Sequence, residues 1–196
     1  MDRKKVDVKY TQLKKRIETI KEHFDFNPGI NGLTPLQNDK IRGMLLLCHA
    51  EFESHIEGLA LLLIDDAYQK WQKTKKSNKI LTSLLVQSEK INTGSIETKI
   101  GKTVSDYKKK VTNNNHGIKD TNISSLFCPL GYEIDDFDSS FIATLSSFGS
   151  DRGTAAHSSA KSTTIMYDKA TEIDRINNIL DDISDFQEVL LSKSNQ

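Results

Sequence analysis

The sequence lacks the features that mark membrane-spanning, secreted and disulfide-linked proteins. Two of its 196 residues are cysteines, and no apolar run reaches the roughly eighteen residues that a spanning helix needs. The first 24 residues are charged and amphipathic, without the apolar centre of a signal peptide. Cys48 and Cys128 stand in apolar surroundings at no metal-binding spacing, so we expect reduced core cysteines. These absences predict a cytoplasmic protein with no membrane contact.

Proline is scarce as well, and β-strand patterns are weak, whereas helical periodicity runs along most of the chain. The longest helix is predicted from Leu36 to Gln72, with Thr34 as its N-cap and Pro35 at the first helical position. Its apolar residues cover more than one face, which is typical of a central helix surrounded by others. A preceding helix carries an apolar stripe made of Val8, Leu13, Ile17, Ile20 and Phe24.

The rest of the chain predicts further helices separated by polar turns. We expect Gly149 to end one helix and Ser150 or Asp151 to cap the next. Residues 92–122 are polar and lysine-rich, which predicts an insertion that is partly helical around residues 100–111. The other expected elements are a helix at 80–91, a short apolar segment at 123–132, a helix opened by Asp138 or Ser139, and a last helix at 168–191. The sum is an all-α antiparallel bundle of about five to seven helices, one domain over residues 1–196 with its core at about 36–191.

Neither sign of charge is in excess, since 27 basic residues balance 27 acidic ones. The distribution is uneven, because residues 69–119 carry 12 basic and 3 acidic side chains while residues 120–196 carry 5 and 13. A basic middle segment of this kind can follow a phosphate backbone. A solvated pair of lysine-rich helices explains the same charges, and charge alone favours that simpler interpretation.

The usual signatures of nucleotide and metal chemistry are absent. There is no glycine-rich phosphate loop, no His-Glu-x-x-His and no Cys-x-x-Cys. Asp135, Asp136 and Asp138 precede a helix, where carboxylates complement the helix dipole, and we prefer this interpretation to a divalent-cation site. His116, in an asparagine-rich turn, is interpreted as a surface residue. The sequence therefore predicts neither a metal nor a cofactor.

One segment, SDRGTAAHSS at residues 150–159, combines residue types suited to phosphate chemistry. Arg152 offers a permanent charge and a planar fork for phosphate oxygens, and His157 exchanges a proton near neutral pH. Five positions place the two about 140° and about 7.5 Å apart on a helix. From a first turn both would reach the helix N-terminus, where N–H groups favour anions. Spacing alone favours a surface arginine and an interfacial histidine over a phosphate site.

A second arginine–histidine pair lies in the long helix. Arg42 and His49 are seven positions apart and therefore share one face, two turns from each other. The residues between them are apolar, which indicates a buried structural site. Carboxylates able to pair with Arg42 there are Glu51, Glu53 and Glu57.

The segment RGMLLLCHAEFESHIEGL in the long helix, followed by LSSFGSDRGTAAHSSA before the last helix, resembles the HEPN family. The resemblance runs over roughly residues 36–191, is least over 92–122, and points to the branch with a His-Ala-Glu-apolar-Glu core helix, here His49 to Glu53. It implies an all-helical domain that dimerises and brings two copies of the motif into one cleft. It also implies that Arg152 and His157 are the catalytic residues, although Gly153 replaces the polar residue common after the arginine.

Active relatives are metal-independent endoribonucleases, so the resemblance implies a toxin or anti-phage effector in which the 2′-hydroxyl of RNA attacks the adjacent phosphate. His157 would move the protons and Arg152 would hold the phosphate, leaving a 2′,3′-cyclic phosphate and a 5′-hydroxyl. Expected partners are a second copy, RNA, and an antitoxin or other regulatory protein. Further substrate contacts are expected from Ser150, Asp151, Thr154 and Ser158. Two alternatives keep the fold without catalysis: a dimeric module that binds RNA, a nucleotide or a protein, and a helical scaffold subunit.

Overall fold

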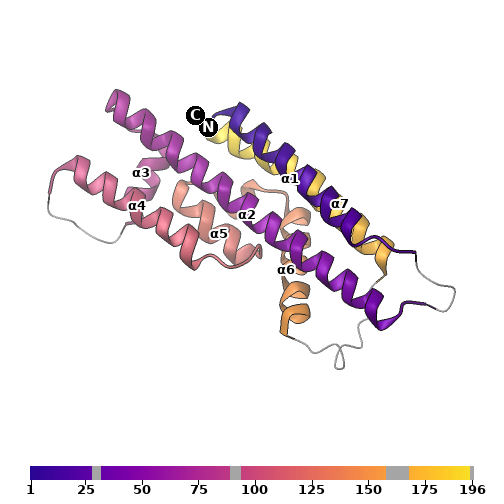
Figure 1. The fold of residues 1–196 in the computed structure, drawn as a ribbon. Helices are drawn as coiled ribbons and strands as arrows, with labels where there is room; N and C mark the ends of the chain where they lie inside the picture. Colours follow the sequence, from indigo (N-terminus) through magenta and orange to yellow (C-terminus); the bar gives the residue numbers. More distant parts are fainter. Residues whose placement is uncertain (28–31, 89–93, 158–167, 195–196) are drawn as a thin grey trace.

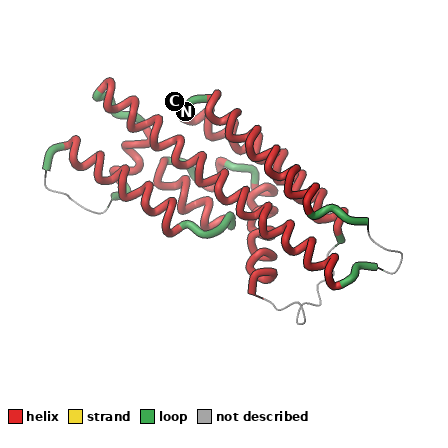
Figure 2. The backbone as a smooth tube through the Cα atoms, viewed as in Figure 1, coloured by secondary structure: helices red, strands yellow, loops and turns green. Residues whose placement is uncertain are grey.

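The computed structural model describes residues 1–27, 32–88, 94–157 and 168–194, with the backbone alone for 154–157. This part of the chain forms seven α-helices and contains no β-strand (Figure 1, Figure 2). The helices are α1 (Arg3–His23), α2 (Pro35–Thr74), α3 (Lys79–Val86), α4 (Ile96–Asn114), α5 (Asp120–Phe127), α6 (Ser139–His157) and α7 (Lys169–Ser194), with the short 3₁₀ turns η1 (Cys128–Leu130) and η2 (Ile134–Asp136) between α5 and α6. The predicted all-α bundle is confirmed.

The long helix α2 is the axis of the molecule, and the other six α-helices all pack against it. Its 40 residues extend about 60 Å at 1.5 Å per residue. Thr34 opens it as predicted: the Thr34 hydroxyl accepts a hydrogen bond from the Gln37 N–H, and the Gln37 side-chain oxygen accepts one from the Thr34 N–H. Buried side chains lie on more than one face of α2, which confirms that it is the central element.

Helices α1 and α7 lie side by side and antiparallel along one flank of α2 (Figure 1). The Met1 amino group donates to the Ser194 hydroxyl at 2.9 Å, which joins the start of α1 to the end of α7. Lys21 Nζ donates to Asn177 Oδ1 at 2.8 Å nearer the other end of the pair. The first and last helices of the chain therefore close the bundle together.

The buried stripe of α1 begins two residues earlier than the sequence predicted. Val6 is 1% exposed, whereas Val8 is 56% exposed. Val6 precedes Leu13 by seven residues, or two helical turns, so the two share a face that Val8 does not. The other predicted members of the stripe, Ile17 and Ile20, are buried, and Phe24 is partly buried. The prediction was wrong at Val8 because both valines lie within one turn at the end of the helix. A period of 3.6 residues does not by itself decide which of them continues the buried stripe.

Residues 92–122, expected as a polar insertion, contain the complete helix α4. Its apolar residues recur every three or four positions and are buried against the core: Ile100, Val104, Tyr107 and Val111. The Tyr107 hydroxyl also donates to the main-chain carbonyl of Leu126 at 2.6 Å. The predicted helix around 100–111 is therefore confirmed, but α4 is longer and packs into the core instead of forming a polar insertion. The preceding helix α3 is shorter than the predicted 80–91 and ends at Val86.

Helix α6 runs through Gly149 without a break, so the predicted helix end at this glycine is wrong. Its start agrees with the sequence, because the Asp138 carboxylate accepts a hydrogen bond from the Phe141 N–H at 2.8 Å. A Cβ atom at position 149 would stand 3.6 Å from His49 Nε2 and 3.3 Å from Lys119 Cγ. Gly149 thus lies inside the helix, where a Cβ would press slightly on the Lys119 side chain and make an ordinary contact with His49.

Both cysteines are free, as the sequence predicted. Cys48 is fully buried in α2, and burial raises the pKa of its thiol to about 12, so the thiol stays protonated at neutral pH. Cys128 is half-buried at the start of η1. None of the described helices is long and apolar enough to cross a membrane.

Val6 and Val8 provide a matched test of how α1 faces the core. We expect Val6→Ala to lower the free energy of unfolding by about 2 kcal/mol, because buried methyl groups are lost and a cavity remains. Val8→Ala should change it by less than about 0.5 kcal/mol, because that side chain lies in solvent. Urea denaturation measures both values, and equal losses would contradict the assigned face.

Candidate functional site

The His-Ala-Glu-Phe-Glu segment of α2 lies against the middle of α6. His49 is 1% exposed, and its ring stacks on Phe148 with the centroids 6.2 Å apart and the planes at 15°. Phe52 packs edge-on against the Phe148 ring, with the centroids 5.9 Å apart. We call this contact of His49, Phe52, Phe148 and Gly149 the α2–α6 junction. It brings together two segments that are far apart in the sequence and that carry the family resemblance.

His49 is neutral at physiological pH because of its surroundings. Burial and, second, the positive charge of Arg152 lower the pKa of the His49 imidazole to about 4. Glu53 Oε2 lies 3.6 Å from His49 Nδ1, too far for a hydrogen bond, and its attraction for a charged ring is outweighed by burial. Nδ1 is buried without a hydrogen-bond partner among the described residues. A ring that stays neutral packs the junction and does not carry protons near pH 7.

Arg152 is exposed on α6, one turn beyond Gly149, and is close enough to affect the pKa of His49. Helix α6 begins at Ser139, thirteen residues or about 20 Å before Arg152 along the helix axis. The predicted position at a helix N-terminus is therefore wrong, and the free N–H groups of a first turn do not lie beside Arg152. The guanidinium itself is the group at this place that can hold an anion.

Arg175 of α7 holds α6 immediately before Arg152. Its Nη1 donates to Asp151 Oδ2 at 2.6 Å, and its Nη2 donates to the Ser147 hydroxyl at 2.8 Å. The guanidinium carbon lies 5.1 Å from the centroid of the Phe148 ring. We call these contacts of Arg175 with Ser147, Phe148 and Asp151 the Arg175 clamp. Sequence reasoning missed Arg175 and expected Asp151 to cap a helix or to contact substrate, because only the packing of α7 on α6 brings the two side chains together.

The other residues predicted for the site are Ser150, Thr154, His157 and Ser158. The Ser150 hydroxyl donates to the Ser146 carbonyl at 2.9 Å inside α6, and Ser150 makes a further interaction. A Cβ at Gly153 would meet no atom within 4 Å, so the position has room for a larger side chain. Thr154 and His157 are described by their helical backbone alone, and Ser158 lies outside the described residues. The roles of the Arg-x4-His pair and its neighbours stay predictions.

The second pair, Arg42 and His49, lies in largely buried surroundings, as the sequence indicated. Arg42 Nη1 lies 3.6 Å from Asp39 Oδ1, one turn away on α2, and Arg42 makes a further interaction. Glu51 and Glu57, which were expected as partners of Arg42, accept hydrogen bonds from α1 and from the loop before α5. This region therefore supports the fold and does not form a separate site.

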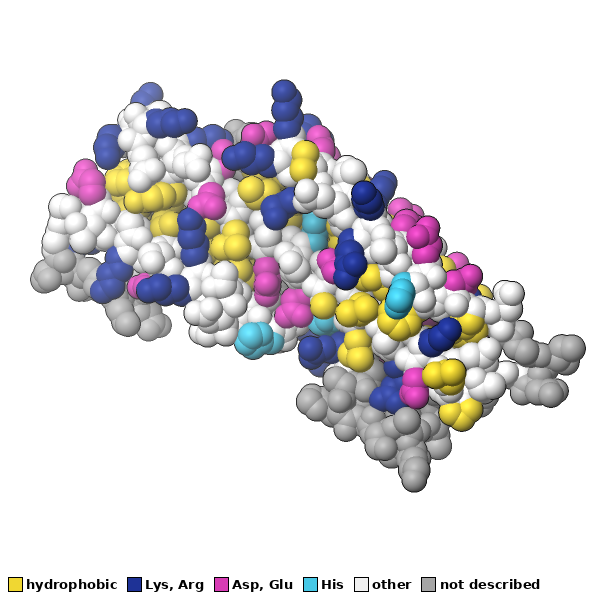
Figure 3. Space-filling view, in the orientation of Figure 1, with side chains coloured by type: hydrophobic (Ala, Val, Ile, Leu, Met, Phe, Trp, Pro, Cys, Tyr) yellow, Lys and Arg dark blue, Asp and Glu magenta, His cyan; other side chains and the backbone are white. Residues whose placement is uncertain are grey.

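The basic middle of the sequence lies mainly away from the α2–α6 junction. Lys108 of α4 pairs with Asp65, which is sixteen residues or about 24 Å along α2 from His49. Lys and Arg side chains spread over the left half of the face in Figure 3, where α4 and the C-terminal half of α2 lie in Figure 1. Lys119 is an exception because its side chain approaches Gly149. The lysines of α4 therefore do not border Arg152 of the same copy.

The acidic group before α6 supports the fold. Asp138 caps α6, and Asp136 pairs with Lys193 of α7. Within the described part of the chain, no group of three or more His, Cys, Asp and Glu side chains is arranged to hold a metal ion. His116 is exposed in the loop after α4, as predicted, and its charge affects the pKa of Glu57. We therefore place the candidate site around Arg152.

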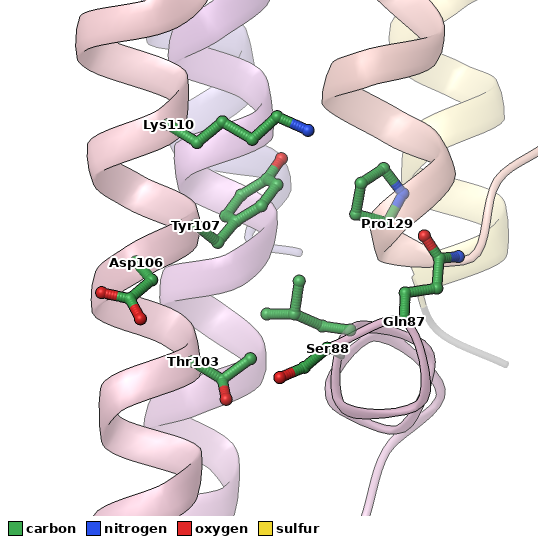
Figure 4. A pocket seen from close by; sticks show the side chains of 8 residues that line it. Gln87, Ser88, Thr103, Asp106, Tyr107, Lys110 and Pro129 are labelled. Atoms are coloured by element: carbon green, nitrogen blue, oxygen red, sulfur yellow. The ribbon is translucent and has the colours of Figure 1, made fainter. Parts of the chain in front are cut away.

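A cleft of about 280 Å³ lies at the other end of the bundle, between α3, α4 and η1 (Figure 4). Figure 4 shows side chains extending toward one another from both sides, among them Thr103, Tyr107 and Lys110 from α4 and Gln87, Ser88 and Pro129 opposite. The Tyr107 hydroxyl and the Gln87 amide donate to the main-chain carbonyls of Leu126 and Cys128. Since these inner polar groups already have partners, the cleft is not our candidate site.

Two buried histidines make the stability of the fold depend on pH. His55 resembles His49, because burial and the charge of Lys9 lower its pKa to about 4. The Nε2 atom of His55 lies 2.7 Å from Nε2 of the buried Gln187 amide, which can only donate, so the ring nitrogen must accept. Both pKa values are near 6.5 in the unfolded chain and about 4 in the fold. Unfolding therefore takes up protons below pH 6.5, and acid favours the unfolded chain.

We expect the free energy of unfolding to fall by about 2 kcal/mol per histidine between pH 7 and pH 5. The stabilisation is complete above pH 6.5 and is lost as the pH falls toward 4. Denaturant titrations at the two pH values measure the loss. His49→Gln should remove about half of the pH dependence, whereas His116→Gln, at an exposed position, should leave it unchanged. If the free energy of unfolding of His49→Gln fell as much between pH 7 and pH 5 as that of the wild type, His49 would not be held neutral in the fold.

No curated protein and no solved structure matches the chain. The family model described as RiboL-PSP-HEPN matches residues 11–193, from the middle of α1 almost to the end of α7. The match spans both segments that meet at the α2–α6 junction, and it confirms the resemblance to the HEPN family. By this match over nearly its whole length, the chain belongs to the RiboL-PSP-HEPN family.

Proposed function

We propose that the protein is a metal-independent endoribonuclease that acts as a dimer. Membership of a HEPN family supports a nuclease or RNA-related function. In the proposed reaction the 2′-hydroxyl oxygen attacks the adjacent phosphorus and the bond from phosphorus to the 5′-oxygen breaks. The products are a 2′,3′-cyclic phosphate and a 5′-hydroxyl, and the reaction needs no added water.

Arg152 and His157 have separate roles in this reaction. The Arg152 guanidinium holds the scissile phosphate and stabilises the charge that grows on its oxygens. One His157 imidazole takes the proton of the 2′-hydroxyl, and the partner subunit's His157 gives a proton to the departing 5′-oxygen. Two copies in opposite protonation states supply the acid and the base, which a single imidazole cannot do at once.

The observation that carries the proposal is the exposed guanidinium of Arg152 beside the α2–α6 junction. Arg152 is exposed and forms no ion pair with another described residue, and a guanidinium of this kind can hold a phosphate. The nearest histidine of α2, His49, is buried and held neutral, which leaves the proton chemistry to His157. A toxin or anti-phage role, with an antitoxin or other regulatory protein, completes the proposal.

We expect the purified protein to cleave RNA in the presence of EDTA and to leave DNA of the same sequence intact, because DNA lacks the 2′-hydroxyl. Arg152→Ala and His157→Ala should each lower the cleavage rate on the order of 100-fold or more. Arg16→Ala and His23→Ala replace exposed residues of the same types on α1 and should retain the wild-type rate. Gel analysis of a labelled oligonucleotide gives the rates, and chemical analysis of the ends identifies the cyclic phosphate.

Three results would contradict this proposal. Cleavage by both variants at the wild-type rate would remove Arg152 and His157 from the site. Binding of RNA without cleavage would favour the non-catalytic module. Loss of cleavage in EDTA that added Mg²⁺ restores would show that a metal takes part.

The dimer can be tested independently of activity. Light scattering coupled to gel filtration should give twice the chain mass of 22.1 kDa. Adding an excess of His157→Ala protein to the wild type should then lower the activity per wild-type chain, because a mixed dimer has one His157 imidazole instead of two. A monomer that cleaves RNA at full rate would contradict the shared acid and base.

A further inference from the structure

We propose that Arg175 is a positioning residue that neutralises the Asp151 carboxylate and so lets an RNA phosphate approach Arg152. The proposal rests on the proposed function, because it names the side chain that prepares the phosphate site. Arg175 itself lies on α7 and is not placed in contact with the substrate. Its effect passes through the residue that precedes Arg152 in the chain.

The Arg175 clamp links three helices next to the candidate site. The Phe148 ring contacts both the Arg175 guanidinium, at 5.1 Å, and the His49 ring, at 6.2 Å, so it joins α7 to α2 through α6. Glu172, one turn before Arg175 on α7, lies 3.6 Å from Nη1 of the guanidinium. Burial, and further the charge of Asp151, raise the pKa of Glu172, whereas Arg175 lowers it. The position of Arg175 is thus fixed from several sides.

The contact with Asp151 matters because of the charge that it cancels. A phosphodiester bound at Arg152 brings a negative charge to the position next to Asp151. An uncompensated carboxylate there would repel the phosphate and would also compete with it for the Arg152 guanidinium. Arg175 Nη1 donates to Asp151 at 2.6 Å, which places a positive charge directly against this carboxylate.

The clamp also fixes the direction of the two neighbouring side chains. Successive residues of an α-helix point about 100° apart. Because Asp151 is held toward Arg175 on α7, Arg152 is turned toward solvent, where it is exposed. The second hydrogen bond, from Nη2 to Ser147 at 2.8 Å, uses the other arm of the fork one turn earlier on α6. Arg175 therefore orients this part of α6 and also pairs with the charge of Asp151.

A purely structural anchor and the proposed role predict different behaviour of a double variant. If Arg175 only holds α6 in place, removing Asp151 as well cannot repair its loss, because the contacts with Ser147 and Phe148 remain absent. If its main effect is to cancel the Asp151 charge, Asp151→Asn in the same chain restores the phosphate site. The double variant therefore separates the two roles.

The first measurement is the affinity for a fluorescent 2′-O-methyl RNA oligonucleotide, which binds but cannot be cleaved, at low salt. We expect Arg175→Gln to weaken binding about fivefold, Arg175→Lys to weaken it less, and Arg175→Gln with Asp151→Asn to return to within about twofold of the wild type. Arg3→Gln is the matched control, because Arg3 forms a similar fork with Glu188 of α7 at 2.6 and 2.7 Å, between α1 and α7. Its affinity should equal that of the wild type.

The second measurement is the pKa of the His49 imidazole, followed by NMR without RNA. Arg152 lowers this pKa in the wild type. The pKa should rise in Arg175→Gln, where the Asp151 charge offsets that of Arg152, and return in the double variant. Glu53 on α2 also faces His49 but is unchanged in every variant. If Arg175→Gln does not fold, the pKa of His49 is measured in Arg175→Lys instead, with and without Asp151→Asn.

The outcomes distinguish this proposal from the proposed function. If the wild type binds and cleaves RNA but Arg175→Gln binds equally well, or the double variant stays as weak as the single one, the role of Arg175 is overturned and the function stands. An unchanged His49 pKa in Arg175→Gln also overturns it. If the wild type neither binds nor cleaves RNA, the proposed function fails and the phosphate has no place at Arg152.

Discussion

The structure depends on the burial of α2 along nearly its whole length. A 40-residue helix with apolar side chains on more than one face is stable in water only when neighbours cover it, and six helices do so here. α1 lies along α2 from Gly43 to Asp66 with α7 antiparallel beside it, while α3 and α4 pack nearer the C-terminal part of α2. Every other element is positioned relative to this axis, including the helix that carries the candidate site.

The same constraint creates the α2–α6 junction. Where α6 covers α2, Gly149 lies beside His49, and Phe148 fills the space beside both His49 and Phe52. The energetic cost of burying an imidazole is limited by keeping it neutral, as its low pKa indicates. His49 therefore packs the core, as the sequence indicated, and the exposed positive charge beside it is that of Arg152 on α6.

Charge is divided between the two faces of α6. On the side of α7, Asp151 is neutralised by Arg175, and on the exposed side Arg152 has no ion pair among the described residues. This division agrees with a site that binds an anion from solvent and depends on side chains instead of a helix N-terminus. In the proposed nuclease, α7 thus contributes to the phosphate site without contacting RNA.

Local patterns in the sequence determined much of this protein: the all-α class, the long central helix, its Thr34 cap and the Asp138 cap of α6. Capping and periodicity depend on residues within one or two turns, so they can be recognised without a fold. Gly149 was misjudged because a glycine that ends a helix and one that admits a neighbour look alike in one dimension. The helix within residues 92–122 was predicted, but its place in the core was not, because its many lysines suggested a solvated segment.

Only the tertiary structure decided that His49 lies beside Arg152 and that Arg175 pairs with Asp151. These partners are separated by 103 and 24 residues, and no local preference connects them. Burial on α2 selects which faces of α6 and α7 meet, and that choice sets the charges around Arg152.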